Sequence, residues 1–267
     1  MVTKLKDKWG LILGGSSGIG LASAKKLASE GMNLIVIHRD RRGAMTEINA
    51  HFSDIRAHGV ELVSFNQDAL SEDSRGDLLT KIADALKSSR LSLMLHSIAL
   101  GNLKPAAPPS GSPDTPLLGE LDLQQTIYNM GSSLLFWVQD LHRANLLADD
   151  TRILGLTSEG NRVTWNGYAA ISAAKATLES LVRAIAKEFA PYGIRCNVLQ
   201  AGLTDTKAFR LIPGCDELAK KAVTKNPFGR LTTPEDVAAV VYLMALKEAA
   251  WINGALLRVD GGEAISG

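Results

Sequence analysis

The chain has 267 residues and nearly balanced charge, with 29 Lys and Arg against 28 Asp and Glu. A chain of this length can bury a large core and lies at the upper end of what one α/β domain holds, so we expect a single domain over residues 1–267. The balanced charge excludes a polyanion-binding surface at the level of net charge, and nucleic acid is not an expected partner.

The two cysteines, Cys196 and Cys215, are too few for a disulfide framework and have no metal-ligand spacing. We therefore expect reduced thiols and no metal site. The first residues lead into a strand without an apolar signal core, and no apolar run of about 18 residues occurs. These features predict a soluble cytoplasmic protein without membrane insertion.

Short apolar runs alternate with longer amphipathic segments along the chain, which predicts a doubly wound, Rossmann-type α/β fold with helices on both faces of a parallel sheet of about seven strands. The last long helix has a clear start, with Thr233 as N-cap and Pro234 at the first helical position. The predicted strands are 11–13, 34–37, 60–65, 91–95, 153–156, 194–199 and 255–259, and the predicted helices are 18–30, 42–58, 72–89, 120–147, 168–190 and 233–247.

A glycine-rich loop, GGSSGIG from Gly14 to Gly20, lies between the first predicted strand and the first predicted helix. Glycines at this spacing permit a tight turn and a close backbone approach, and the free N–H groups of the helix then point at an anionic pyrophosphate. The loop predicts dinucleotide binding. A glycine turn made only for packing is the alternative.

The residues after the second strand, HRDRRG from His38 to Gly43, contain three arginines around Asp40. An acidic residue there would accept from the ribose 2′-hydroxyl of NAD, whereas an arginine would pair with the 2′-phosphate of NADP. Arg39, Arg41 and Arg42 therefore favour NADPH over NADH. A solvated helix start is the alternative for these arginines.

Three polar side chains, Ser158, Tyr168 and Lys175, follow the strand at 153–156 within eighteen residues. On one helix, residues seven apart differ by about 20° in azimuth, so Tyr168 and Lys175 would share a face. A nearby ammonium would favour the phenolate form and lower the tyrosine pKa from its ordinary value near ~10, which would make the phenol a better proton donor. These residues are our candidate catalytic groups, although such a pair also arises by coincidence.

Two segments stand apart from the regular pattern. Residues 101–119 hold five of the nine prolines and predict a long loop. Residues 204–228 include a stretch, Lys207 to Phe228, that is interrupted by Pro213 and Gly214 and carries apolar and basic side chains, as a substrate-binding lid would. An exposed helical pair between two strands is the alternative.

With these motifs the chain resembles the short-chain dehydrogenase/reductase family over nearly its whole length. The resemblance is carried by the glycine loop, by Asn129, Ser158 and Lys175, and by the segments RLTTPEDVAAVVYLM and NGALLRVDGG. In that family Asp68 would meet the adenine, Leu203 the nicotinamide carboxamide and Thr206 a cofactor phosphate, while Asn129 would organise a water or brace the fourth helix. The resemblance implies a cofactor site made of Gly14, Ser16, Ser17, Gly18, Ile19, Gly20, Arg39, Asp40, Asp68, Ala69, Ser97, Ile98, Lys175, Gly202, Leu203 and Thr206.

The chain departs from most of that family at one position, because Ile171 stands four residues before Lys175, where a tyrosine is usual. Tyr168 lies seven before the lysine instead. This wider spacing, with HSIA (96–99) and QAGLTDT (200–206), resembles the enoyl-acyl-carrier-protein reductases of bacterial fatty-acid synthesis. The glycine loop keeps the spacing of the ordinary family, so a branch that combines the ordinary loop with the wide spacing fits best.

The resemblance implies reduction of an enoyl thioester of acyl carrier protein or CoA by NADPH. Tyr168 would donate to the enolate oxygen and Lys175 would hold the nicotinamide ribose; Ser158 would add a second donor, orient the substrate or only satisfy backbone at the strand end. An NADP-dependent ketone or alcohol oxidoreductase, for example one acting on a hydroxysteroid or 3-oxoacyl substrate, is the main alternative. A non-catalytic nucleotide sensor is the other.

Wide apolar faces on the predicted helices 120–147 and 168–190 exceed what one sheet face needs, and the resemblance also implies a homotetramer. We expect these helices to form the symmetric interfaces. The residues concerned are Ile127, Leu134, Leu135, Val138, Leu141, Leu178, Leu181, Val182, Ile185 and Phe189.

Overall fold

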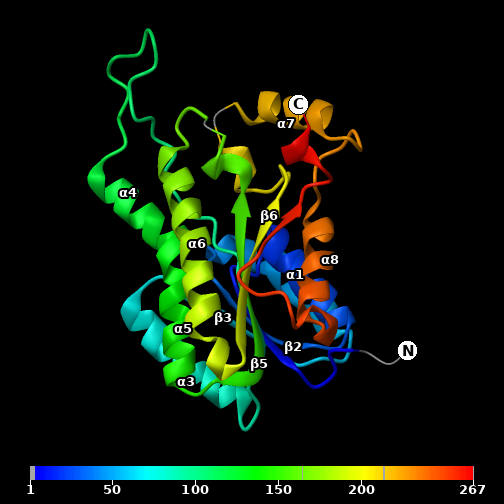
Figure 1. Ribbon diagram of the computed structural model, residues 1–267. Helices are drawn as coiled ribbons and strands as arrows, with labels where there is room; N and C mark the ends of the chain where they lie inside the picture. The colour runs from blue at the N-terminus through cyan, green and yellow to red at the C-terminus, as the bar shows by residue number, and fades with distance from the viewer. Residues whose placement is uncertain (1–3, 164, 213, 267) are drawn as a thin grey trace.

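The computed structural model describes residues 4–163, 165–212 and 214–266, which form a three-layered α/β fold around a seven-stranded parallel sheet (Figure 1). The strand order is β3-β2-β1-β4-β5-β6-β7, so the chain reverses direction across the sheet between β1 and β4. The predicted doubly wound fold is confirmed. The strands are β1 (Trp9–Leu13), β2 (Asn33–His38), β3 (Leu62–Asn66), β4 (Leu91–His96), β5 (Leu147–Ser158), β6 (Ile194–Ala201) and β7 (Leu256–Val259).

Helices cover both faces of the sheet, and each face has its own apolar core. Helices α3, α5 and α6 pack on one face, and α1, α2 and α8 pack on the other (Figure 1). Their bounds are α1 (Gly18–Ser29), α2 (Met45–Arg56), α3 (Glu72–Leu86), α5 (Ser133–Arg143), α6 (Ala169–Glu188) and α8 (Pro234–Ala245). No helix in the described part of the chain has the length and apolar character needed to cross a membrane.

The predicted start of the last helix is confirmed. Thr233 is the N-cap of α8, and its hydroxyl accepts a hydrogen bond from the Asp236 N–H at 3.2 Å, while the Asp236 carboxylate accepts from the Thr233 N–H at 2.8 Å. Each side chain satisfies a backbone donor of the other residue, which fixes where the helix begins.

The predicted helix at 120–147 is wrong in two respects. It is divided into α4 (Glu120–Ile127), a π-helical turn (Tyr128–Ser132) and α5, and it ends at Arg143, because β5 already begins at Leu147. At the turn Gly131 lies against α6: a Cβ there would be 2.8 Å from the Ala174 carbonyl oxygen. The wide turn and the glycine together allow the two helices to approach.

The apolar faces assigned to subunit contacts are largely used within the chain. Leu134, Val138, Leu141, Leu178, Val182 and Ile185 are all buried in the core between the helices and the sheet. For these six residues, the prediction that the apolar faces exceed what one sheet face needs is wrong. The homotetramer itself stays a prediction.

The two irregular segments lie at the same end of the molecule. Residues 101–119 form a loop that projects beyond α4 (Figure 1), and the Leu118 N–H donates to the Pro105 carbonyl at 2.9 Å near its base. Residues 204–228 contain a 3-10 turn (Phe209–Leu211) and one helix, α7 (Cys215–Lys225), which lies across the carboxyl ends of the strands. Pro213, part of the predicted interruption, lies outside the described residues.

Candidate active site

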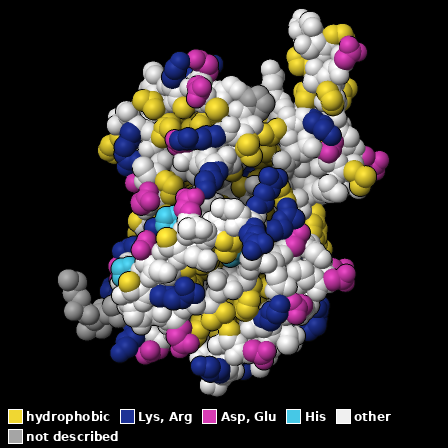
Figure 2. Space-filling view, turned by 180° about the vertical axis from the view of Figure 1, so that it is seen from behind, with side chains coloured by type: hydrophobic (Ala, Val, Ile, Leu, Met, Phe, Trp, Pro, Cys, Tyr) yellow, Lys and Arg dark blue, Asp and Glu magenta, His cyan; other side chains and the backbone are white. Residues whose placement is uncertain are grey.

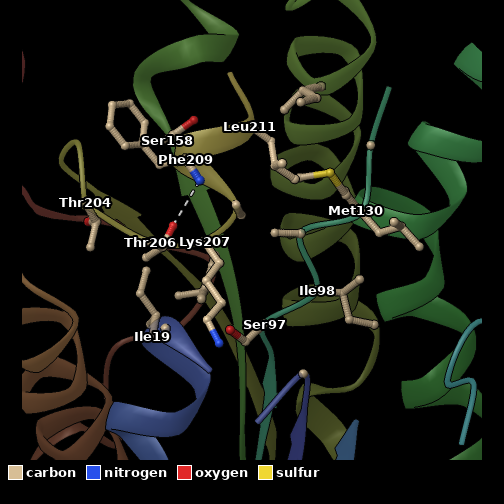
Figure 3. A pocket seen from close by; sticks show the side chains of 18 of the residues that line it. Ile19, Ser97, Ile98, Met130, Ser158, Thr204, Thr206, Lys207, Phe209 and Leu211 are labelled. Atoms are coloured by element: carbon tan, nitrogen blue, oxygen red, sulfur yellow. Dashed lines mark hydrogen bonds between the residues drawn. The ribbon is translucent and has the colours of Figure 1, made fainter. Parts of the chain in front are cut away.

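A pocket of about 560 Å³ opens at the carboxyl ends of the strands. It lies at the reversal of strand order between β1 and β4, where ligands bind in open α/β sheets. Figure 3 shows side chains from separate parts of the chain converging on it: Ile19 from α1, Ser97 and Ile98 after β4, Met130 from the π-helical turn, and Thr206 and Phe209 after β6.

The glycine loop forms a cradle that is lined by backbone atoms instead of side chains. Gly14 has φ +83°, and a Cβ there would lie 2.3 Å from the Ser97 carbonyl oxygen; a Cβ at Gly20 would lie 2.1 Å from the Gly14 carbonyl oxygen. No acidic side chain occupies the first turn of α1, so nothing there offsets the positive end of the helix dipole. An anionic phosphate group fits this cradle.

The residues predicted to bind cofactor line this pocket, except Gly20, whose place inside α1 is structural. Thr206 stands across the loop, 3.4 Å from where a Cβ of Gly18 would lie. The loop, Asp68 and Ala69 on one side and Lys175, Gly202 and Leu203 on the other thus belong to one cavity.

Of the three arginines after β2, only Arg39 lines the pocket. Its guanidinium donates to Asp68 Oδ2 at 2.7 Å, and its side chain is 58% exposed. Asp40 also lines the pocket, where its carboxylate contacts Nδ1 of buried His38 at 2.8 Å. Arg41 and Arg42 are exposed and do not line the pocket, so Arg39 is the one of the three arginines whose side chain belongs to the cavity.

Ser158 and Tyr168 meet on the opposite side of the pocket, Ser158 at the end of β5 and Tyr168 at the N-cap of α6. The phenol ring packs edge to face on Trp165, with the ring centroids 5.0 Å apart. Gly160 makes room for the ring, because a Cβ there would lie 2.3 Å from Tyr168 Cε1. The ring is therefore held by contacts that sequence spacing does not reveal.

The hydroxyl of Ser158 is buried and has no hydrogen-bond partner among the described residues. The alternative in which it only satisfies backbone at the strand end thus finds no support. The hydroxyl lies near enough to the phenol to lower its pKa somewhat, but burial is the larger effect and raises the pKa of Tyr168 above its ordinary value. Our expectation of a lowered tyrosine pKa is wrong in this structure, because burial of the phenol dominates.

Lys175 is buried on α6, and its ammonium donates to the Leu156 carbonyl oxygen at 2.8 Å. Burial lowers the pKa of Lys175 to about 8, and the carboxylate of Glu179 one turn later opposes part of that shift. Glu179 also accepts hydrogen bonds from Thr157 at 2.8 Å and from Asn161 at 2.7 Å. The lysine thus faces the pocket with a buried counter-charge behind it.

Asn129 braces the wall of the pocket rather than lining it. Its side-chain amide donates to the Leu100 carbonyl oxygen at 3.1 Å, and its backbone carbonyl oxygen accepts from the Ser133 hydroxyl at 3.0 Å. Ser133 in turn contacts His96 Nε2 at 2.8 Å. Burial and the nearby Lys175 charge lower the pKa of His96 to about 3, so this imidazole is neutral near pH 7. These contacts support the bracing role.

The remaining wall of the pocket is apolar. Ile171 is buried there beside Met130, and the segment predicted as a lid contributes side chains from above (Figure 3). In the space-filling view, apolar side chains gather around the segment predicted as a lid, and charges of both signs mix over the rest of that face (Figure 2). The apolar lining of this wall includes Leu100, Leu103, Met130, Trp165, Ile171, Phe209, Leu211, Ile212 and Leu218.

A family model described as enoyl-(acyl carrier protein) reductase matches residues 14–263. The chain belongs to the short-chain dehydrogenase/reductase family. It is therefore an oxidoreductase of a family that uses NAD(P)(H), and the glycine cradle described above fits the pyrophosphate of such a cofactor.

Relatives within this family carry different activities in their names. A probable 2,4-dienoyl-CoA reductase of Bacillus subtilis is 27% identical over 97% of this chain and 97% of its own length. A 3-oxoacyl-acyl-carrier-protein reductase, FabG, of Aquifex aeolicus is 27% identical over 98% and 99%. A solved short-chain dehydrogenase/reductase of Serratia marcescens superposes with a TM-score of 0.82 at 24% identity, covering 98% and 99%, which shows the shared fold.

Sequence reasoning missed two buried acids at the site. Glu179 could have been found, because it follows Lys175 by four residues on the same helix, where side chains are neighbours. Glu263, which lines the pocket and is only 3% exposed, follows the terminal glycine pair and has no periodic signal. Its position in the pocket depends on where the last part of the chain returns to the sheet beside β6.

Proposed function

We propose that this protein reduces the 2,3 double bond of an enoyl thioester, carried by acyl carrier protein or CoA, with NADPH. The observation that carries the proposal is which side chain near the start of α6 can donate a proton. Ile171, which has no proton to give, occupies the position four before Lys175, and the phenol of Tyr168 lines the pocket in its place. The apolar wall around Ile171 suits an acyl chain.

NADPH bound along the pocket would supply the hydride that the β carbon of the substrate receives. Negative charge then develops on the thioester oxygen, and the Tyr168 hydroxyl donates a hydrogen bond to it. A raised pKa keeps this phenol protonated, which suits a donor that stabilises an enolate without giving up its proton. The α carbon would then take its proton from solvent water, which completes the reduction. Lys175 would add positive charge to the site, since its ammonium is buried at the same pocket.

Reduction of a ketone is the second candidate. It is favoured by the buried Ser158 hydroxyl, which has no partner in the described part of the chain and lies beside the phenol, as a pair of donors to one carbonyl oxygen would. In this case Tyr168 would give its proton to an alkoxide, and the raised pKa would oppose that transfer. We therefore place enoyl reduction first.

A substrate panel tests this order. We expect NADPH oxidation with crotonyl-CoA or an enoyl carrier-protein thioester to exceed that with acetoacetyl-CoA and simple ketones by at least tenfold in kcat/KM, because a phenol with a raised pKa suits stabilising an enolate better than protonating an alkoxide. Absorbance at the NADPH band gives the rates. Faster turnover of the ketones would instead establish the second candidate.

Cofactor preference depends on Arg39. We expect the parent protein to prefer NADPH over NADH by at least tenfold in kcat/KM, because one charge-assisted pair with the 2′-phosphate is worth about 1.5–3 kcal/mol. Arg39→Ala should remove most of this preference, whereas Arg42→Ala, outside the pocket, should retain it. Equal or better kcat/KM with NADH in the parent would contradict the assignment and direct attention to Asp40.

A further inference from the structure

Glu263 lies in the described 3-10 turn Glu263–Ile265 after β7, at the end of the pocket formed by β5 and β6. Its carboxylate faces the residues that follow β6: a Cβ at Gly202 would lie 2.9 Å from Glu263 Oε2, so a larger residue at 202 would collide with it. The close approach places this acid directly against the Gly202–Leu203 backbone.

The carboxylate is short of donors. The Leu203 N–H is its hydrogen-bond donor within the described residues, and that one N–H is shared between the two oxygens at long distances of 3.4 and 3.2 Å. An ionised carboxylate can accept about four hydrogen bonds, and a buried one without donors is costly. Glu263 is 3% exposed, so solvent supplies little of the deficit. A donor from a ligand in the pocket would fill it.

Neighbouring charges increase this demand. Burial, Glu159 and Asp260 raise the pKa of Glu263, while the Leu203 N–H and Lys225 oppose the shift. Lys225 is itself paired with Glu159 at 3.4 Å, and Asp260 accepts from the backbone N–H groups of Gly262 and Ala264. The nearby cation, Lys225, is thus shared with Glu159, and the carboxylates of Glu159 and Asp260 repel that of Glu263.

The direction of a dinucleotide in the pocket follows from the sheet. In a bound dinucleotide the adenine end would lie near Arg39 and Asp68, after β2 and β3, and the glycine cradle after β1 would hold the phosphates. The other half must then extend toward β5 and β6, where Ser158, Leu203 and Glu263 line the cavity. A bound nicotinamide ring would therefore lie at the Glu263 end.

We propose that Glu263 orients the cofactor by accepting a hydrogen bond from the amide NH₂ of the nicotinamide carboxamide. That group is the N–H donor of the nicotinamide ring, and it can use a carboxylate lone pair that Leu203 leaves free. The inference rests on the proposed use of a nicotinamide cofactor at this pocket. It adds a residue that recognises the ring by its amide.

Direct binding to two nucleotides tests the inference without any substrate. The full chain is titrated with NADP⁺ and with its 3-acetylpyridine analogue, in which a methyl group replaces the amide NH₂, and Kd is measured by calorimetry. Both rings carry the same positive charge, so the ratio of the two Kd values cancels general attraction to the acids. We expect the analogue to bind the parent protein about tenfold or more weakly, as loss of a bond to a charged acceptor implies.

Glu263→Ala should weaken NADP⁺ by about tenfold, change the analogue by less than about twofold and bring the ratio close to one. Glu263→Gln keeps shape and a neutral acceptor, so it should fold and show an intermediate ratio even if the alanine variant does not. Glu217→Ala, an exposed acid on α7, should keep the parent ratio.

An unchanged ratio in the folded Glu263 variants would overturn the proposal. That result is distinct from failure of the proposed reaction, because a protein that binds both nucleotides as expected and still ignores enoyl thioesters would refute only the substrate. Failure of the parent to bind NADP⁺ at all would refute both.

Discussion

Tyr168→Phe is expected to lower kcat for an enoyl thioester by on the order of 100-fold, the typical cost of removing one donor from a developing oxyanion. The dissociation constant of NADPH should hardly change, because the ring still packs on Trp165 beside Gly160 and Lys175 is untouched. Single-turnover kinetics with saturating NADPH, together with a direct titration of the cofactor, would separate the two quantities.

Ser158→Ala is the matched comparison, because its hydroxyl lies beside the phenol in the same pocket. If Ser158 adds only a second, neutral donor, its loss should cost about fivefold in kcat. The assignment of the phenol is refuted if Tyr168→Phe stays within about twofold of the parent while Ser158→Ala loses on the order of 100-fold.

The elements of the fold could be predicted because each strand is a short apolar run between amphipathic segments. The ends of β1, β2 and β4 differ from expectation by at most two residues, and the α8 start was fixed by its own capping residues. The break at 128–132 was not predictable, because it accompanies the close approach of α6 to Gly131, a contact between segments distant in sequence. Local patterns carry no information on such contacts.

The same distinction applies to the site. Predicted cofactor residues line one pocket because a loop after a parallel strand must lie at the carboxyl edge of the sheet. The pKa of Tyr168 could not be predicted from its spacing to Lys175, since it is set by burial of the phenol. The place of Glu263 in the pocket could not be predicted either, because it depends on where the chain returns beside Gly202.

Lys175→Ala is expected to damage both catalysis and cofactor binding, since it removes a buried charge that lines the same pocket as the phenol. We expect a loss on the order of 100-fold or more in kcat and a rise of about tenfold in the Kd of NADPH.

The loss would not reflect unfolding. A lysine whose pKa falls from 10.5 to about 8 on folding costs stability below about pH 8, and the cost is relieved as pH rises, so Lys175→Met should melt no lower than the parent near pH 7.

The pH dependence of the parent tests the same assignment. Because the pKa of Lys175 lies at about 8, the ammonium is lost as pH rises through that value, and kcat/KM should fall there about tenfold per pH unit. Glu179→Gln removes the carboxylate that opposes the burial shift while keeping an acceptor for Thr157 and Asn161. The fall should then begin at lower pH, because the charged form of the lysine loses its counter-ion. A profile that is flat from pH 7 to 9.5 in the parent, or one that moves to higher pH in Glu179→Gln, would show that the Lys175 ammonium does not control the reaction.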